Sequence, residues 1–301
     1  MKPAPIVLFT YNRLDHTRQT VGALQKNNLA SDSELFIYSD GPKTGQEKAV
    51  ADVRSFLNTI NGFKKITIVE HEKNWGLADS VVEGVTSIVN TYGKVIVLED
   101  DIVTSRYFLQ YMNDALVLYE NEKRVMHING YCPPIDFRKT DEDSFFYRLT
   151  MSWGWATWQD RWNKYSDDSQ TLLNQLVKKS LLDYFDIDGS FRFSSTLRAN
   201  VRQEIKTWAV KWYASVTLSD GLCLNPSRSL VQNIGNDGSG TNALASENFL
   251  TKSTTENIKL KKQPVEESML ISKKIKEYYS SLKPSLLEKL VLRLQLLLKK
   301  V

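Results

Sequence analysis

Cysteine and histidine are scarce in this chain of 301 residues, which has two cysteines and three histidines. Cys132 and Cys223 lie far apart and do not have the spacing of metal ligands, so the sequence predicts neither a disulfide framework nor a zinc site. A reducing compartment, the cytoplasm, is therefore expected. No apolar run approaches the length of about 18 residues that a membrane-spanning helix needs. The apolar run near the N-terminus is also too short for a signal peptide.

Excess positive charge is missing from most of the chain. The whole sequence has a net charge of +4, but residues 252–301 alone carry +7, so the preceding part is mildly acidic. Nucleic-acid-binding domains carry a basic patch on the folded body, and this distribution argues against nucleic acid as a partner.

The apolar pattern in the first hundred residues alternates between two periods. Strands are expected over 5–10, 34–39, 65–70 and 94–98, and helices over 14–27, 47–60 and 77–92. Such alternation is typical of βαβ units and predicts an α/β fold with a mostly parallel sheet flanked by helices. Further along, helices are expected over 107–120, 172–185 and 193–219, and strands over 124–129, 145–149, 222–225 and 229–232.

Three adjacent carboxylates, Glu99, Asp100 and Asp101, follow directly after the fourth predicted strand. Their mutual repulsion raises the cost of folding unless a cation or ligand hydroxyls lie among them. Mg²⁺ and Mn²⁺ prefer such oxygen ligands. The alternative is a solvated acidic turn.

Polar residues follow each of the other predicted parallel strands as well. The strand ends carry the segments 10–13, 39–41 and 71–76. Because ligands of parallel sheets bind beyond the carboxyl ends of the strands, these segments and the acidic triplet are expected to line one rim. An anionic nucleotide bridged to the triplet by a cation would suit this rim, although each residue by itself is better explained as a turn or cap residue.

Two later segments combine glycine with aromatic or polar residues. Residues 151–158 hold three tryptophans around Gly154, where glycine allows close backbone approach and Trp rings offer stacking faces for sugars. The alternative, favoured for any single Trp, is a Trp-rich part of the core at a turn. Residues 233–242 are rich in glycine and lack the Lys-Ser/Thr of a phosphate-binding P-loop. They are read either as a loop that folds over a ligand or as a connector.

The composition changes near residue 250. We expect a domain over 1–250, a linker over 251–267 and a basic amphipathic helical tail over 268–301. A helix expected over 285–301 has a broad leucine face with Lys and Arg elsewhere, which suits an anionic membrane surface. Docking on its own domain or on a partner subunit of a homo-oligomer is the alternative.

Taken together, these motifs resemble those of GT-A fold glycosyltransferases over about residues 4–243. The strand followed by Glu99-Asp100-Asp101 is similar to the acidic motif of the N-acetylglucosaminyltransferase I family. Residues 153–155, 227–229 and 235–238 resemble its Gly-Trp, Ser-Arg and Gly-rich segments. The chain is also similar to bacterial polysaccharide glycosyltransferases of this type.

The resemblance implies roles for individual residues. Asp101 would hold Mn²⁺ or Mg²⁺, Asp100 would contact the ribose, and Glu99 would hydrogen-bond the donor sugar. Asp40 would bind the nucleotide base. The remaining residues of the donor site would be Thr10, Tyr11, Asn12, Arg13, Asn74, Gly76 and Ser80, and those of the acceptor side Trp153, Gly154, Trp155 and Trp208.

The general base is the part of the pattern that this sequence does not match. The family carries an Asp one or two residues after a Trp on the long helix, whereas Ala209 and Val210 follow Trp208 here. Glu204 is the first substitute, because residues four apart share a helix face. Asp237 in the Gly-rich loop is the second.

The resulting hypothesis is an inverting, metal-dependent transfer of a sugar, an N-acetylhexosamine being one candidate, from a nucleoside diphosphate donor to a saccharide. UDP-sugar is the favoured donor. The product would be a bacterial surface polysaccharide such as capsule or lipopolysaccharide O-antigen, made at the cytoplasmic face of the membrane by a peripheral enzyme. A sugar-phosphate nucleotidyltransferase and a glycan-binding protein without catalysis are the alternatives.

Overall fold

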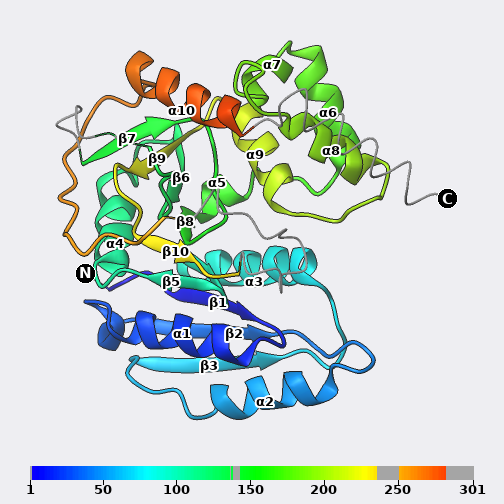
Figure 1. The fold of residues 1–301 in the computed structure, drawn as a ribbon, viewed down its shortest axis with the longest axis vertical. Helices are drawn as coiled ribbons and strands as arrows, with labels where there is room; N and C mark the ends of the chain where they lie inside the picture. Colours follow the sequence, from blue (N-terminus) through cyan, green and yellow to red (C-terminus); the bar gives the residue numbers. More distant parts are fainter. Residues whose placement is uncertain (1, 136, 138–142, 236–250, 283–301) are drawn as a thin grey trace.

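The computed structural model describes residues 2–135, 137, 143–235 and 251–282 (Figure 1). Its centre is an eight-stranded sheet with the strand order β3-β2-β1-β4-β8-β6-β9-β7. In chain order these strands are β1 (Ile6–Thr10), β2 (Glu34–Ser39), β3 (Lys65–Glu70), β4 (Lys94–Glu99), β6 (Val125–Asn129), β7 (Ser144–Tyr147), β8 (Trp155–Trp158) and β9 (Leu222–Pro226).

The sheet is mostly parallel, as predicted. β1 pairs in parallel with β2 and β4, and β2 pairs in parallel with β3. β8 is antiparallel to both of its neighbours, β4 and β6, so β6 runs in the direction of β4. β9 is parallel to β6, and β7 closes the edge antiparallel to β9. Only β7 and β8 oppose the common direction of the described strands in this sheet.

Helices cover both faces of the sheet (Figure 1), and the central strand β1 is buried along its whole length as a result. Alternate side chains of β1 show this: Ile6 and Leu8 pack with α1, α2 and α4, while Val7 and Phe9 pack with α3 and α9. The α-helices are α1 (Leu14–Gln25), α2 (Glu47–Leu57), α3 (Leu77–Tyr92), α4 (Phe108–Leu118), α5 (Gln159–Trp162), α6 (Ser169–Lys178), α7 (Leu182–Phe185), α8 (Phe193–Val201), α9 (Ala209–Leu218) and α10 (Met269–Ser281). None of the helices within the described ranges is long and apolar enough to span a membrane.

Two helices predicted as continuous are each broken in two. The segment expected over 172–185 forms α6 and α7, and the one expected over 193–219 forms α8 and α9. Each break follows a residue with positive φ, Ser180 (56°) and Gln203 (58°). After Gln203, the Glu204 N–H bonds back to the Ala199 carbonyl at 3.0 Å, the pattern of a Schellman C-cap. The prediction was wrong here because neither cap uses the glycine that usually marks one.

Two strands were not predicted. β8 is four residues long and fully buried, and its Trp residues had suggested a ligand motif instead of a strand. β5 (Ile102–Thr104) pairs with β10 (Val231–Asn233) in a small antiparallel sheet of its own. This pairing places residues 231–235 directly beside the acidic triplet that precedes β5.

The C-terminal segment is part of the folded body as far as residue 282. In the stretch predicted as a linker, Ile258 is 2% exposed in the core and Glu267 bridges to β7 at Phe146. α10 buries Ile271, Ile275 and Tyr279 against the lobe formed by α6 to α9, and it lies across the top of the sheet beside β7 (Figure 1). The predicted domain boundary near residue 250 therefore needs correction. The helix expected over 285–301 lies outside the described residues.

Candidate functional site

A cleft of about 320 Å³ opens at the carboxyl ends of β1, β2 and β4. The parallel register explains why its walls meet, because Thr10 lies beside Ser39 and Phe9 lies beside Glu99. All ten residues predicted to bind the donor line this cleft. Its lining consists of Phe9, Thr10, Tyr11, Asn12, Arg13, Tyr38, Asp40, Lys43, Asn74, Trp75, Gly76, Leu77, Ala78, Ser80, Glu99, Asp100 and Lys206.

Arg13 connects the strand ends to the acidic triplet. Its Nη2 donates to Asp100 Oδ1 at 2.5 Å and to Asp101 Oδ2 at 2.8 Å. Asp101 is 8% exposed and, unlike Asp100 and Arg13, is not among the residues that line the cleft. A guanidinium between two buried carboxylates offsets part of their repulsion. The triplet is therefore not a solvated acidic turn.

Burial, together with the remaining repulsion, raises the pKa values of two carboxyl groups in the triplet. Burial, together with the charges of Asp101 and Asp100, raises the pKa of Glu99 to about 8. Burial also raises the pKa of Asp100 to about 6, although Arg13 opposes this shift. At neutral pH Glu99 is mostly protonated, so its carboxyl group can donate a hydrogen bond to a ligand oxygen.

At the acidic triplet and Arg13, two buried polar atoms have no partner among the residues that the structure describes. They are Arg13 Nη1, a donor, and Asp101 Oδ1, an acceptor. Within the described parts of the chain no three His, Cys, Asp or Glu side chains are grouped as a complete metal site. One free carboxylate oxygen suits the kind of Mg²⁺ or Mn²⁺ site that one or two carboxylates share with substrate phosphates. The unpartnered guanidinium nitrogen beside it suits a phosphate oxygen.

Gly235 lies against the Asp101 carboxylate. The Ile234 N–H donates to the Asp101 carbonyl at 2.9 Å, which continues the pairing of β10 with β5. A Cβ atom on Gly235 would lie 2.1 Å from Asp101 Oδ2 and 3.0 Å from Arg13 Nη1. Glycine is therefore needed here for close approach, and the Gly-rich segment begins at the triplet, which the sequence alone did not indicate.

Asp40 is occupied by its own loop. Its two carboxylate oxygens accept hydrogen bonds from the backbone N–H groups of Gly41, Trp75 and Gly76 and from Asn74 Nδ2, all at 2.8–2.9 Å. A carboxylate has about four lone-pair sites, and all are used here. Asp40 therefore shapes the loop that follows β3, and the predicted contact with the base would require the loss of one of these bonds.

Trp75 is the main cleft residue that the sequence analysis missed. Its side chain is 46% exposed, and its ring stacks on the imidazole of His71 at 3.9 Å between centroids. His71 is held in turn by Arg54, whose Nη2 donates to the His71 carbonyl at 2.7 Å. Lys43 and Lys206 add two cations to the lining. Trp75 stands between Asn74 and Gly76, two residues that were singled out, and its own aromatic character was the overlooked signal.

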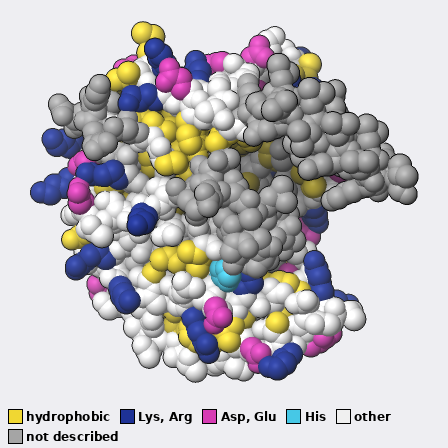
Figure 2. All heavy atoms as spheres, viewed as in Figure 1, with side chains coloured by type: hydrophobic (Ala, Val, Ile, Leu, Met, Phe, Trp, Pro, Cys, Tyr) yellow, Lys and Arg dark blue, Asp and Glu magenta, His cyan; other side chains and the backbone are white. Residues whose placement is uncertain are grey.

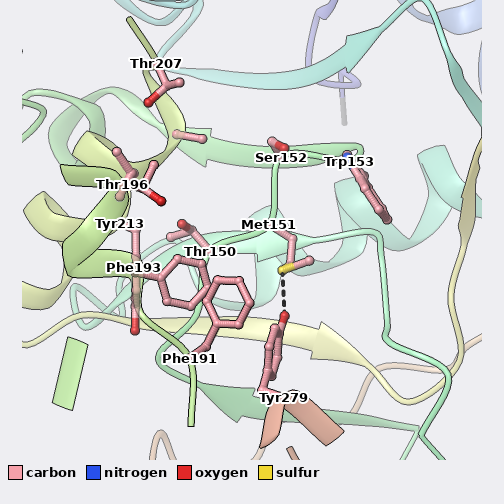
Figure 3. Close-up of a pocket in the computed structure, with 12 residues that line it drawn as sticks. Thr150, Met151, Ser152, Trp153, Phe191, Phe193, Thr196, Thr207, Tyr213 and Tyr279 are labelled. Atoms are coloured by element: carbon pink, nitrogen blue, oxygen red, sulfur yellow. Dashed lines mark hydrogen bonds between the residues drawn. The ribbon is translucent and has the colours of Figure 1, made fainter. Parts of the chain in front are cut away.

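The predicted acceptor residues do not form an exposed platform. Trp155 and Trp208 are 0% and 4% exposed and stack on each other at 5.2 Å, so they belong to the core. Gly154 has φ = 64°, and a Cβ atom there would lie 2.9 Å from Val231, which explains the glycine by packing alone. Trp153 lines a cavity in the described part of the chain (Figure 3), and none of the residues that line this cavity also lines the cleft.

A buried polar network holds the segment that carries Trp153. Trp212 Nε1 donates to His127 Nδ1 at 3.0 Å, so His127 Nε2 carries the proton and donates to Asn129 Oδ1 at 2.8 Å. The same Asn129 oxygen accepts from the Met151 N–H at 2.7 Å. Burial lowers the pKa of His127 to about 3, so the ring is neutral and has a structural role.

Glu204 does not reach the cleft. It follows the end of α8 and therefore does not share a helix face with Trp208, which corrects the prediction. Its carboxylate forms a bidentate pair with Arg202, at 2.7 and 2.8 Å, and this hydrogen bonding lowers its pKa. Instead, its neighbour Lys206 lines the cleft, tied to Asp79 at 2.5 Å. Asp237 lies outside the described residues.

No protein-family model and no curated protein sequence matches this chain. Among solved structures it is similar to the mannosyltransferase PcManGT from Pyrobaculum calidifontis in complex with GDP-Man and Mn²⁺ (15% identity, TM-score 0.40, 58% of this chain and 52% of that chain). It is also similar to S. aureus TarS, as residues 1–349 (11% identity, TM-score 0.41, 75% and 59%) and as a longer chain (13%, 0.29, 42% and 21%). The alignment thus spans less than two thirds of each of these chains.

Proposed function

We propose that this chain is a metal-dependent glycosyltransferase that moves a sugar from a nucleoside diphosphate, UDP being the favoured carrier, to a saccharide hydroxyl with inversion. The observation that carries the proposal is a pair of buried atoms that have no partner among the described residues, Arg13 Nη1 and Asp101 Oδ1, where Arg13 lines a cleft at the carboxyl ends of parallel strands. A diphosphate oxygen would accept a hydrogen bond from Arg13 Nη1, and a divalent cation would bind Asp101 Oδ1.

Arg13, Asp101 and Glu99 would contact different parts of the donor. Arg13 would donate to the diphosphate and Asp101 would hold the cation, while protonated Glu99 would donate to a hydroxyl of the donor sugar. When bound, Mn²⁺ or Mg²⁺ supplies Lewis-acid stabilisation of the charge that develops on the leaving diphosphate. In the transfer, the acceptor oxygen forms a bond to the anomeric carbon, the bond from that carbon to the diphosphate breaks, and the hydroxyl proton goes to a base.

The base is the open assignment. The carboxylates in the described lining of the cleft are Asp40, Glu99 and Asp100, and all three lie on the donor side. Glu204 is exposed and paired with Arg202, so we propose Asp237, which follows Gly235 by two residues in the sequence, as the first residue to test.

For the donor base we propose the exposed ring of Trp75 as the stacking surface. The amide nitrogen of Asn74 already donates to Asp40 and to the Gly41 carbonyl. Asn74 Oδ1 would accept a hydrogen bond from the edge of the base. The product proposed from the sequence is a bacterial surface polysaccharide, made at the cytoplasmic face of the membrane.

A donor screen tests the proposed function directly. Purified protein with Mn²⁺ and a panel of UDP- and GDP-sugars, assayed with and without saccharide acceptors, is expected to release nucleoside diphosphate from one donor. Release of pyrophosphate from a nucleoside triphosphate and a sugar phosphate would instead identify a nucleotidyltransferase. Glycan binding with no turnover of any donor would identify a binding protein.

The base-stacking assignment predicts a loss of nucleotide affinity in Trp75→Ala. Stacking of a base on an aromatic ring is worth about 1–3 kcal/mol, so the Kd for nucleoside diphosphate should rise by about tenfold or more. Isothermal titration calorimetry in the presence of Mn²⁺ measures it. Phe56→Ala, a partly exposed aromatic residue of α2 away from the cleft, is the matched control and should leave Kd unchanged. Equal affinity of both variants would remove Trp75 from the base site.

A further inference from the structure

A second cavity of about 300 Å³ lies in the helical lobe, between the loop before β8, the start of α8, α9 and the end of α10 (Figure 3). Its described lining has five aromatic rings and four Thr or Ser side chains, and it contains no Lys, Arg, His, Asp or Glu. On the same side of the molecule, hydrophobic side chains gather on the surface below α10 (Figure 2). The cavity thus offers a neutral surface that is neither fully apolar nor charged.

Three of the rings form one continuous wall. Phe191 packs against Phe193 with ring centroids 4.7 Å apart, and against Tyr279 of α10 at 5.5 Å. Figure 3 shows these rings in the lower part of the view, with Thr196 above them, Thr207 farther up, and Ser152 and Trp153 across from them. Such rings provide flat apolar faces for the C–H surface of a pyranose.

The Thr and Ser side chains of the cavity supply the hydrogen-bond donors and acceptors that the aromatic rings lack. Thr207 is held by Asn200, whose Oδ1 accepts from its N–H at 2.9 Å and whose Nδ2 donates to its Oγ1 at 3.0 Å. A hydroxyl group both donates and accepts, so Thr150, Ser152 and Thr196 can match the hydroxyls of a sugar. A lipid chain would leave these groups unpaired, and a charged sugar would lose hydration without finding a counter-ion.

The cavity and the cleft are lined by residues that are close together in the sequence. Lys206 lines the cleft, while Thr207 and Ala209, one and three residues later, line the cavity. Consecutive Cα atoms are about 3.8 Å apart, so the Cα atoms of residues 206–209 lie within about 11 Å of one another, and this short segment contributes to both linings. The ion pair of Lys206 with Asp79 and the bonds of Thr207 to Asn200 fix this backbone from both sides.

We infer that this cavity binds an uncharged sugar unit of the acceptor; the inference rests on the proposed transferase function. It moves the acceptor site away from the buried Trp155 and Trp208 to the ring wall of Phe191, Phe193 and Tyr279. It also makes α10, which lies beyond the region of family resemblance, a part of acceptor recognition.

Saturation-transfer NMR on the full chain tests the inference with defined probes. The probes are methyl β-glucoside, methyl β-N-acetylglucosaminide, glucuronate and octyl β-glucoside. Transfer to the pyranose protons of the neutral glycosides, and none to glucuronate, is the expected result. Transfer to no glycoside, or to the alkyl chain of octyl glucoside but not to its ring, would overturn it, the second result in favour of a lipid.

Variants locate the binding in the cavity. Phe191→Ala and the near-isosteric Thr196→Val are each expected to weaken glycoside binding by about fivefold, as the loss of about 1 kcal/mol predicts. Phe56→Ala is the control. Unchanged binding in both cavity variants would contradict the inference. Nucleotide titration distinguishes failure of the sugar-site inference from failure of the transferase proposal. If the wild type binds glycosides in the cavity but no nucleotide, the transferase proposal fails and the sugar site stands.

Discussion

Replacement of Asp101 by asparagine is expected to lower metal-dependent release of nucleoside diphosphate by about 100-fold or more. The variant keeps the shape of the side chain, and its amide oxygen can still accept from Arg13 Nη2, which Asp101 Oδ2 now does at 2.8 Å. The amide nitrogen then takes the place of the unpartnered Oδ1, where it cannot ligate a cation. A Lewis-acid contribution of several kcal/mol corresponds to at least a hundredfold in rate, since each 1.4 kcal/mol is tenfold.

The measurement is turnover of the donor identified in the screen, as a function of Mn²⁺ concentration, together with the apparent Mn²⁺ affinity. Asp52→Asn is the control, because Asp52 is an aspartate on the surface of α2 that pairs only with Lys48 in the described structure. If Asp101→Asn kept more than about a third of wild-type turnover at every Mn²⁺ concentration, Asp101 would not be the metal ligand.

Replacement of Arg148 by alanine is expected to destabilise the fold by about 3–5 kcal/mol. Arg148 is 5% exposed, and its Nη2 and Nε donate to the two oxygens of Glu267 at 2.6 and 2.8 Å. Its Nη1 reaches Asp188 at 3.2 Å, and the guanidinium lies 3.6 Å from the ring centroid of Tyr184. Removal of one partner of a buried pair leaves the other charge uncompensated, which costs about this much. The melting temperature should fall by roughly 10 °C.

Arg228→Ala is the matched control for Arg148→Ala. Arg228 also pairs with two carboxylates, those of Asp143 and Glu256, but its side chain is 43% exposed. Exposed pairs are worth about 0–1 kcal/mol, so its melting temperature should change little. Thermal unfolding of both alanine variants is the measurement. The double variant Arg148→Met/Glu267→Gln, compared with its two single variants, gives the coupling between Arg148 and Glu267. Equal melting temperatures of the two alanine variants would show that Glu267 does not anchor the C-terminal segment to the sheet.

The sequence was sufficient to predict that the residues proposed for donor binding lie together. Parallel strands separated by helices must bring their carboxyl ends to one edge, and polar residues end or directly follow β1, β2 and β4. Thr10, Asp40 and Glu99 therefore lie in one cleft although they are far apart in the chain. The alternation of apolar residues was sufficient for this inference because it depends on local periodicity, which each segment carries in itself.

The hydrogen-bond partners of those residues, and the position of the second cavity, depended on the tertiary structure. Asp40 is saturated by the loop after β3, Arg13 bridges two carboxylates nearly ninety residues away, and Gly235 reaches Asp101 through an unpredicted pair of short strands. Each of the two long predicted helices ends early at a cap without glycine. Glu204 therefore does not lie on one helix face with Trp208, as had been expected. The sequence by itself therefore determined which residue types gather at the sheet edge. Burial and pairing were decided only by the packed structure, because they arise from contacts between segments that no local pattern records.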